Sequence, residues 1–224
     1  MLKFIAIVCA SLVAVTAAPA NVTVLDKRAT VADGNSVRTG NLLDWEFRYR
    51  SAGYVAKGCP PGTGISTCYE YRLSKDPKKN IDTDSERHIL QRNEFYSATK
   101  LADGKAREYT FKMNVDRSIT SIKQTNPLPI VGLDTGEGTT NAGNPGMPVY
   151  LDLRNNLAGI YTDERREPVI AMPLADFVGR PTHHLWEHKP GSPGYIKIKI
   201  MDDITKQTLL TFNKTGQFSL GTYR

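Results

Sequence analysis

Several segments of the chain alternate apolar side chains one by one with polar or charged ones. The alternation is strict over residues 43–50 and recurs over 109–115, 149–153 and 196–200. Because successive side chains of a strand point to opposite faces, this pattern predicts strands with one face on a core and the other towards solvent or a cleft. No long segment has the 3.6-residue period of a helix, and residues 172–178 allow one helical turn at most.

Turn-forming residues separate these segments. Gly, Pro, Asn and Asp gather at residues 102–105, 144–146 and 189–194, and residues 133–148 are the best candidate for a long surface loop. Many short antiparallel strands in one domain are typical of a sandwich or a barrel. The sequence therefore predicts an all-β fold, a β-sandwich of jelly-roll (concanavalin-like) type, although periodicity alone does not separate the jelly roll from other sandwiches.

The N-terminus has the three parts of a secretory signal peptide. Lys3 precedes an apolar run over residues 4–15, and small residues follow as far as Ala20. The run is shorter than the roughly 20 apolar residues that a membrane-spanning helix needs. We therefore expect residues 1–20 to be a signal peptide and the protein to be extracellular.

A dibasic pair predicts a second processing step. Lys27-Arg28 lies in a short polar segment, as the furin-like cleavage sites of secreted fungal proteins do. Cleavage there would make residues 21–28 a propeptide. The remaining residues 29–224 number 196, which is enough for one β-sandwich domain with a sizeable core.

Secretion determines the expected chemistry of the cysteines and of the glycosylation motifs. Cys9 lies in the signal peptide, whereas Cys59 and Cys68 flank a Pro- and Gly-rich segment and are predicted to form a disulfide. A metal-binding pair is the rival interpretation, but it lacks further ligands at a suitable spacing, and we expect no metal and no other cofactor. The sequon at Asn213 predicts glycosylation, while the one at Asn21 would leave with the propeptide.

The charge of the chain is mildly positive. Loss of residues 1–28, which carry three basic residues and one acidic residue, lowers the formal net charge from +6 to +4. This excess fits an acidic ligand, and it fits mere solubility equally well. It is not the dense basic patch that nucleic-acid binding requires.

Three parts of the chain carry short motifs whose order and spacing resemble those of one enzyme family. They are Gln91–Phe95, then Ile122–Asn126 with the strand at 148–153, and finally Trp186 with residues 194–203 and 218–224. Together they resemble the jelly-roll polysaccharide lyases, which include alginate lyases and fungal glucuronan lyases. The resemblance covers residues 45–224, and no single motif in it is specific.

The chemistry of such lyases explains the residue types that the resemblance selects. The substrate is a polymer of uronic acids, and the enzyme removes the proton at C5 while the glycosidic oxygen leaves C4. An amide, guanidinium or ammonium group must bind the neighbouring carboxylate and stabilise the developing enolate. A base takes the proton and an acid protonates the leaving oxygen, and a tyrosine can do one or both.

The resemblance assigns these tasks to particular residues. Arg92, with its forked guanidinium, and Gln124 would bind the carboxylate, and Tyr223 would act as base or acid. Further substrate contacts would come from Asn126, His88, Lys197, Lys199 and Arg224. Each residue also has an ordinary interpretation, and the two lysines fit a solvated strand face better than a binding site.

The sequence departs from the family pattern in three places. Asn126 stands where several members have a histidine, and it cannot serve as a base. Ser219 stands where the family often has a lysine, and the chain ends at Arg224, where members usually continue with another strand. These departures put the activity, more than the fold, in question.

Three histidines near Trp186 invite a zinc interpretation. They are His183, His184 and His188, and two of them have the spacing of a metal-binding pair. No helical pattern and no known motif with a paired carboxylate accompany them, so this interpretation is the weaker one.

Three hypotheses for the function follow. The first is a secreted lyase that cleaves a glucuronan- or alginate-like polysaccharide by β-elimination, and the alternative is a non-catalytic, lectin-like carbohydrate-binding or secreted interaction protein on the same fold. A glycoside hydrolase would need two carboxylates across a cleft, for which Glu46, Glu70 and Glu94 are candidates without a hydrolase motif around them. We expect a monomer that binds an anionic polysaccharide, with neither nucleic acid nor a membrane as partner.

Overall fold

A computed structural model of the chain shows an all-β protein. It describes residues 54–74, 104–120, 128–133, 149–162 and 167–218, and it describes the backbone of 3–4, 29–33, 36–42, 45–51 and 92–97. Within these residues the chain forms antiparallel sheets and one helical turn, α1 (Leu174–Phe177). The predicted all-β class is therefore confirmed. None of the helical structure in this part of the chain is long and apolar enough to cross a membrane.

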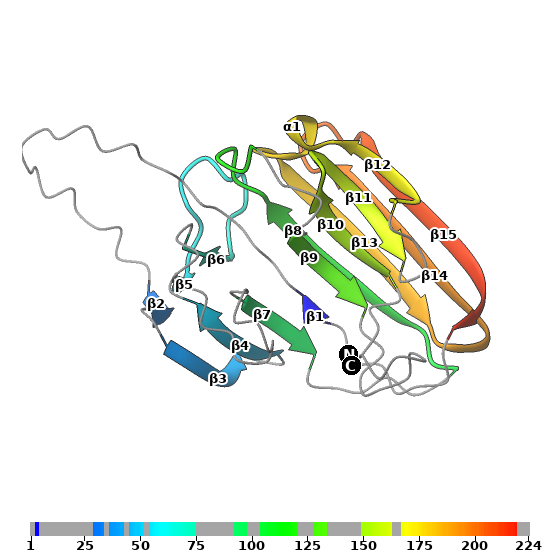
Figure 1. The fold of residues 1–224 in the computed structure, drawn as a ribbon, viewed down its shortest axis with the longest axis horizontal. Helices are drawn as coiled ribbons and strands as arrows, with labels where there is room; N and C mark the ends of the chain where they lie inside the picture. Colours follow the sequence, from blue (N-terminus) through cyan, green and yellow to red (C-terminus); the bar gives the residue numbers. More distant parts are fainter. Residues whose placement is uncertain are drawn as a thin grey trace, which may run out of the picture.

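Two four-stranded sheets make up most of the C-terminal part (Figure 1). The first has the strand order β12–β11–β10–β9 and the second the order β15–β14–β13–β8. Their strands are β8 (Arg107–Asn114), β9 (Leu128–Leu133), β10 (Val149–Arg154), β11 (Leu157–Thr162), β12 (Ile170–Pro173), β13 (Pro181–Lys189), β14 (Gly191–Asp202) and β15 (Thr208–Phe218).

Two further sheets come from the N-terminal part of the chain. Their orders are β1–β7–β4–β3 and β2–β5–β6. The strands are β1 (Lys3–Phe4), β2 (Ala29–Asp33), β3 (Ser36–Leu42), β4 (Trp45–Ser51), β5 (Tyr54–Lys57), β6 (Tyr69–Arg72) and β7 (Arg92–Ser97). Because β1 belongs to the predicted signal peptide, cleavage of that peptide would leave β7 at the edge of its sheet.

The alternating segments of the sequence coincide with β4, β8, β10 and β14, and the predicted helical turn contains α1. The turn predicted at residues 189–194 is confirmed, since Lys189 pairs with Tyr195 and residues 190–194 reverse the chain between the paired parts of β13 and β14. Gly191, at φ +117°, lies at this reversal, and the β14–β15 register shifts between Gly191 and Gly194. The sharp turn between β10 and β11 uses Asn155 and Asn156, both at positive φ, as two-residue hairpins require.

The two larger sheets face each other across one apolar core. Ile196, Ile198 and Ile200 of β14 and Trp186 of β13 are fully buried in the same cluster as Leu151 and other side chains of β9–β11. Burial of each such side chain contributes about 1.5–3 kcal/mol. In β14 every second side chain from Ile196 to Ile200 therefore packs in the core, and the side chains between them lie on the opposite face of the sheet.

Two histidines of β13 lie inside this core. His184 is fully buried, stacks on Phe111 with ring centroids 4.7 Å apart, and has its Nε2 2.8 Å from Thr182 Oγ1. The Thr182 hydroxyl donates to the carbonyl of Met113, so His184 Nε2 carries the proton in their shared bond. Burial lowers the pKa of His184 to about 3 and the pKa of His188 to about 4. Both rings are therefore neutral at pH 7.

Acid should destabilise the fold through these histidines. In the unfolded chain they bind protons below a pH of about 6.5, whereas in the folded protein they stay neutral, so their contribution is full above that pH and is lost as the pH falls. We expect the unfolding free energy from urea titration to drop by about 2 kcal/mol per histidine between pH 7 and pH 5. His184→Gln should remove its share of this drop, while His183→Gln, on the opposite face of β13, should keep it. Equal pH dependence in both variants would contradict the assignment.

Candidate functional site

The structure describes only some of the predicted site residues. The disulfide between Cys59 and Cys68 is confirmed, with their Cα atoms 5.2 Å apart. Arg92 is described through the backbone of β7. Five of the predicted residues lie outside the described part of the chain: His88, Gln124, Asn126, Tyr223 and Arg224.

Lys197 and Lys199 share the outward face of β14, opposite the core isoleucines. Lys197 Nζ lies 3.1 Å from Glu187 Oε2 and 4.6 Å from the centre of the Tyr195 ring. The Tyr195 hydroxyl donates to Glu187 Oε1 at 2.5 Å, which lowers the pKa of Glu187 and raises the pKa of Tyr195. The sequence did not predict Tyr195 and Glu187 as site residues. The register of β13 against β14 brings them together.

The predicted glycosylation residue lies on the same sheet. Asn213 of β15 is exposed and directly opposite Lys197 in the strand register. The three histidines, in contrast, do not converge, because His184 and His188 point into the core while His183 is on the outward face. Among the described residues no group of three or more His, Cys, Asp or Glu side chains gathers as a metal site.

The strand with Arg92 lies against β4 with a register that concentrates charge. Arg92 is directly opposite Arg50, and Glu94 is directly opposite Arg48. Directly opposed residues of antiparallel strands occupy the same face of the sheet. Three arginine positions therefore share one face, although the sequence analysis had singled out only Arg92.

A buried ionic cluster lies on the face of β10 that points away from the core. Arg154 Nη2 is 2.6 Å from Asp152 Oδ2, the Asp152 side chain is fully buried, and the Arg154 side chain is 15% exposed. The guanidinium lies 4.7 Å from the centre of the Tyr161 ring, and Tyr150 stacks on Tyr161. Burial raises the pKa of Asp152 and the pKa of Tyr161.

This cluster holds the beginning of β9. The second carboxylate oxygen of Asp152 accepts a hydrogen bond of 2.7 Å from the backbone N–H of Leu128. Leu128 follows four residues after Gln124, so Asp152 anchors the chain close to the predicted substrate-binding segment. The alternation over 149–153 predicted a second face on this strand, but it gave no sign that the face is buried.

Glu70, one of the candidate hydrolase carboxylates, is fully buried and lies 2.7 Å from the Nε of Arg72. This location does not suit a carboxylate that must reach a sugar across a cleft.

Comparison with protein families, with curated proteins and with solved structures finds no match for this chain. The interpretation of the site therefore depends on its residues alone.

Removal of Arg154 should strongly destabilise the protein. Arg154→Ala leaves the buried Asp152 carboxylate without its charge partner, and breaking such a pair typically costs about 3–5 kcal/mol. Asp152→Asn in the same background should recover part of the loss, because the amide oxygen still accepts from Leu128 and carries no charge. Chemical denaturation of the single and double variants measures both effects. A loss below about 1 kcal/mol in Arg154→Ala would mean that the pair is exposed to solvent.

Proposed function

We propose that the protein is a secreted polysaccharide lyase of jelly-roll type that cleaves a uronic-acid-containing polymer, glucuronan- or alginate-like, by β-elimination. The proposal unites the motif resemblance of residues 45–224 with the all-β sandwich and with the placement of arginines on β4 and β7.

The opposed arginines on β4 and β7 carry this proposal. Arg50 and Arg92 occupy directly opposed positions, and Arg48, opposed by Glu94, lies one step further along the same face. Like charges in directly opposed positions destabilise a sheet. A carboxylate bound between two guanidinium groups removes this repulsion, because each guanidinium offers a forked set of donors to it. A polyuronate supplies such carboxylates at every sugar.

The β-elimination needs no water and no added electrons. A base takes the C5 proton, its electron pair forms the C4–C5 double bond, and the glycosidic C4–O bond breaks while an acid protonates the leaving oxygen. Arg92 and Gln124 are proposed to hold the carboxylate and stabilise the enolate, and Tyr223 to act as base or acid. The Asp152–Arg154 pair acts through the backbone, since it anchors Leu128 just after Gln124.

Activity on polyuronates tests the proposal. Incubation of the secreted protein with glucuronan and with alginate should produce the ultraviolet absorbance of an unsaturated uronate. Tyr223→Phe, Gln124→Ala and Arg92→Gln should each reduce the rate by about 10²–10³-fold, because each removes a group that acts in the transition state. Arg107→Gln, on β8, serves as the matched control and should retain the rate.

Stability separates a functional role of Arg92 from a structural one. Loss of one of two opposed charges should leave the unfolding free energy of Arg92→Gln unchanged or slightly higher. Wild-type rates in these three variants would overturn the site assignment. Reducing ends without absorbance would indicate hydrolysis instead of elimination.

The alternative is a lectin-like binder without turnover. It is favoured by the outward face of β14, where Lys199 is exposed and the Lys197 ammonium, paired with Glu187, lies over the Tyr195 ring. Salt-sensitive binding of alginate without absorbance, weakened by Lys197→Met and Lys199→Met, would support this alternative over the lyase.

A further inference from the structure

A pocket of about 760 Å³ lies at one end of the sandwich, next to α1. Four separate segments line it: the disulfide-closed loop, the chain that follows β8, the chain that follows α1, and the turn between β14 and β15. Its volume is in the range of pockets that bind small organic molecules. None of its lining residues belongs to the lyase site proposed above.

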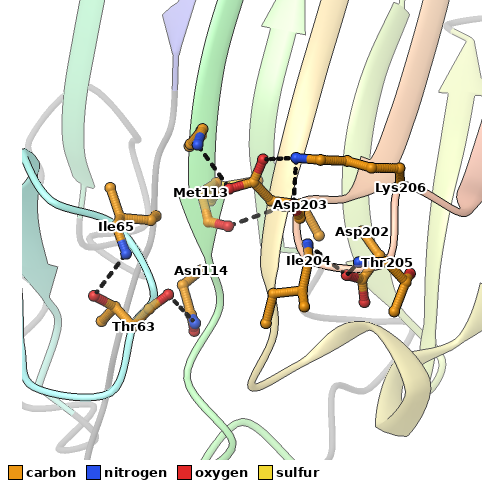
Figure 2. A network of polar contacts seen from close by, with 11 residues as sticks. Thr63, Ile65, Met113, Asn114, Asp202, Asp203, Ile204, Thr205 and Lys206 are labelled. Atoms are coloured by element: carbon orange, nitrogen blue, oxygen red, sulfur yellow. Dashed lines mark hydrogen bonds and ion pairs between the residues drawn. The ribbon is translucent and has the colours of Figure 1, made fainter.

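The disulfide-closed loop is fixed to the sandwich at this end. The side-chain amide of Asn114, at the end of β8, donates to the carbonyl of Thr63 at 3.0 Å (Figure 2). Gly64, at φ +70°, approaches Pro181 so closely that a Cβ would lie 2.9 Å from the proline Cγ. The loop wall of the pocket is therefore formed before any ligand arrives.

Two arginines from different segments line the pocket. Arg117 follows β8 and makes no ion pair within the described residues, and its side chain is exposed. The aliphatic part of the Arg117 side chain passes over Gly179, and a Cβ on Gly179 would overlap the Cγ of Arg117. Gly179, at φ +74°, donates its N–H to the carbonyl of Val115 at 2.6 Å. The absence of a side chain at Gly179 therefore leaves room for Arg117 beside the pocket.

Asp202, the acidic residue of the pocket lining, uses much of its hydrogen-bonding capacity within the β14–β15 turn. Its Oδ1 accepts the backbone N–H groups of Ile204 and Thr205 at 2.8 and 2.9 Å (Figure 2), and these bonds lower the pKa of the carboxyl. Its Oδ2 is 3.3 Å from Arg180 Nη1, which is the long limit of a hydrogen bond. The lining contains two arginines and one carboxylate, so its formal net charge is +1.

The remaining lining residues suit the body of an organic ligand. Thr120 and Thr205 provide hydroxyl groups, while Ile119 and Val178 provide apolar surface. Ile204 is 73% exposed at this pocket and is the large apolar side chain of the described residues that is open to solvent. We propose that the pocket binds a small organic oxyanion, a molecule with one carboxylate, sulfate or phosphate group, whose charge lies between Arg117 and Arg180 and whose body contacts Ile204.

Calorimetric titration of the full secreted protein tests this assignment. The probes are sodium glucuronate, glucose 6-sulfate, glucose 6-phosphate, neutral glucose and inorganic phosphate. At least one of the three sugar acids should bind with a dissociation constant below about 10 mM, and glucose should not bind. Which of them binds most tightly identifies the acid group. Inorganic phosphate should bind at least about tenfold more weakly than that sugar acid, because it lacks the organic body.

Three variants locate the binding. Arg117→Ala and Arg180→Ala should each weaken it by about tenfold or more, as expected for loss of one charge-assisted contact. Asp202→Asn should tighten it several-fold, since the amide still accepts the turn N–H groups while the competing charge is gone. A gain of affinity cannot arise from misfolding. Arg107→Ala, at the opposite end of β8, should leave the affinity unchanged.

Several results would overturn the proposal. They are the absence of saturable binding of all three sugar acids, binding that survives both arginine variants, or weaker binding in Asp202→Asn. If inorganic phosphate bound as tightly as the best sugar acid, the pocket would bind an adventitious ion only, without any contribution from an organic body. Lyase assays of the same variants keep the two proposals apart, because Arg117→Ala should lose the titration signal and retain elimination, while Arg92→Gln should do the reverse.

Discussion

The dry layer between two antiparallel sheets determines where every other group of this protein can lie. Ile198 of β14 and Leu151 of β10 belong to the same buried cluster, to which β14 contributes every second side chain from Ile196 to Ile200. The cost of burying polar groups leaves only neutral ones in this layer, so His184 and His188 are held unprotonated at neutral pH. The charged side chains of these two sheets therefore lie on their outward faces and at the ends of the sandwich.

Outside the core, ion pairs neutralise several of the charged side chains that the structure describes. Asp152 and Arg154 form a largely buried ion pair, whereas the ion pair between Lys197 and Glu187 is exposed to solvent. Arg50 and Arg92 are directly opposed in the register of β4 and β7, and Glu94 lies opposite Arg48 on the same face. The proposed polyuronate would place its carboxylates at these arginine positions.

The end pocket depends on parts of the chain that are distant in sequence. Cys59 and Cys68 close the loop that forms one wall, and Asn114 fixes that loop to β8. Gly179 leaves room for the Arg117 side chain, and the backbone N–H groups of the β14–β15 turn donate to the Asp202 carboxylate. Both proposed sites thus recognise acids with arginines, one along a sheet face and the other at the end of the sandwich.

By itself the sequence determined the all-β class, the positions of β4, β8, β10 and β14, and the Cys59–Cys68 disulfide, because alternation and cysteine spacing are local properties of the chain. It also drew attention to Arg92 and to Lys197. Only the tertiary structure decided which strands are neighbours, and strand register is set by long-range packing that no local pattern encodes. For this reason four features could not be predicted from the order of residues: Arg50 opposite Arg92, Tyr195 beside Glu187, the burial of Asp152, and the presence of Arg117 and Arg180 in one pocket lining.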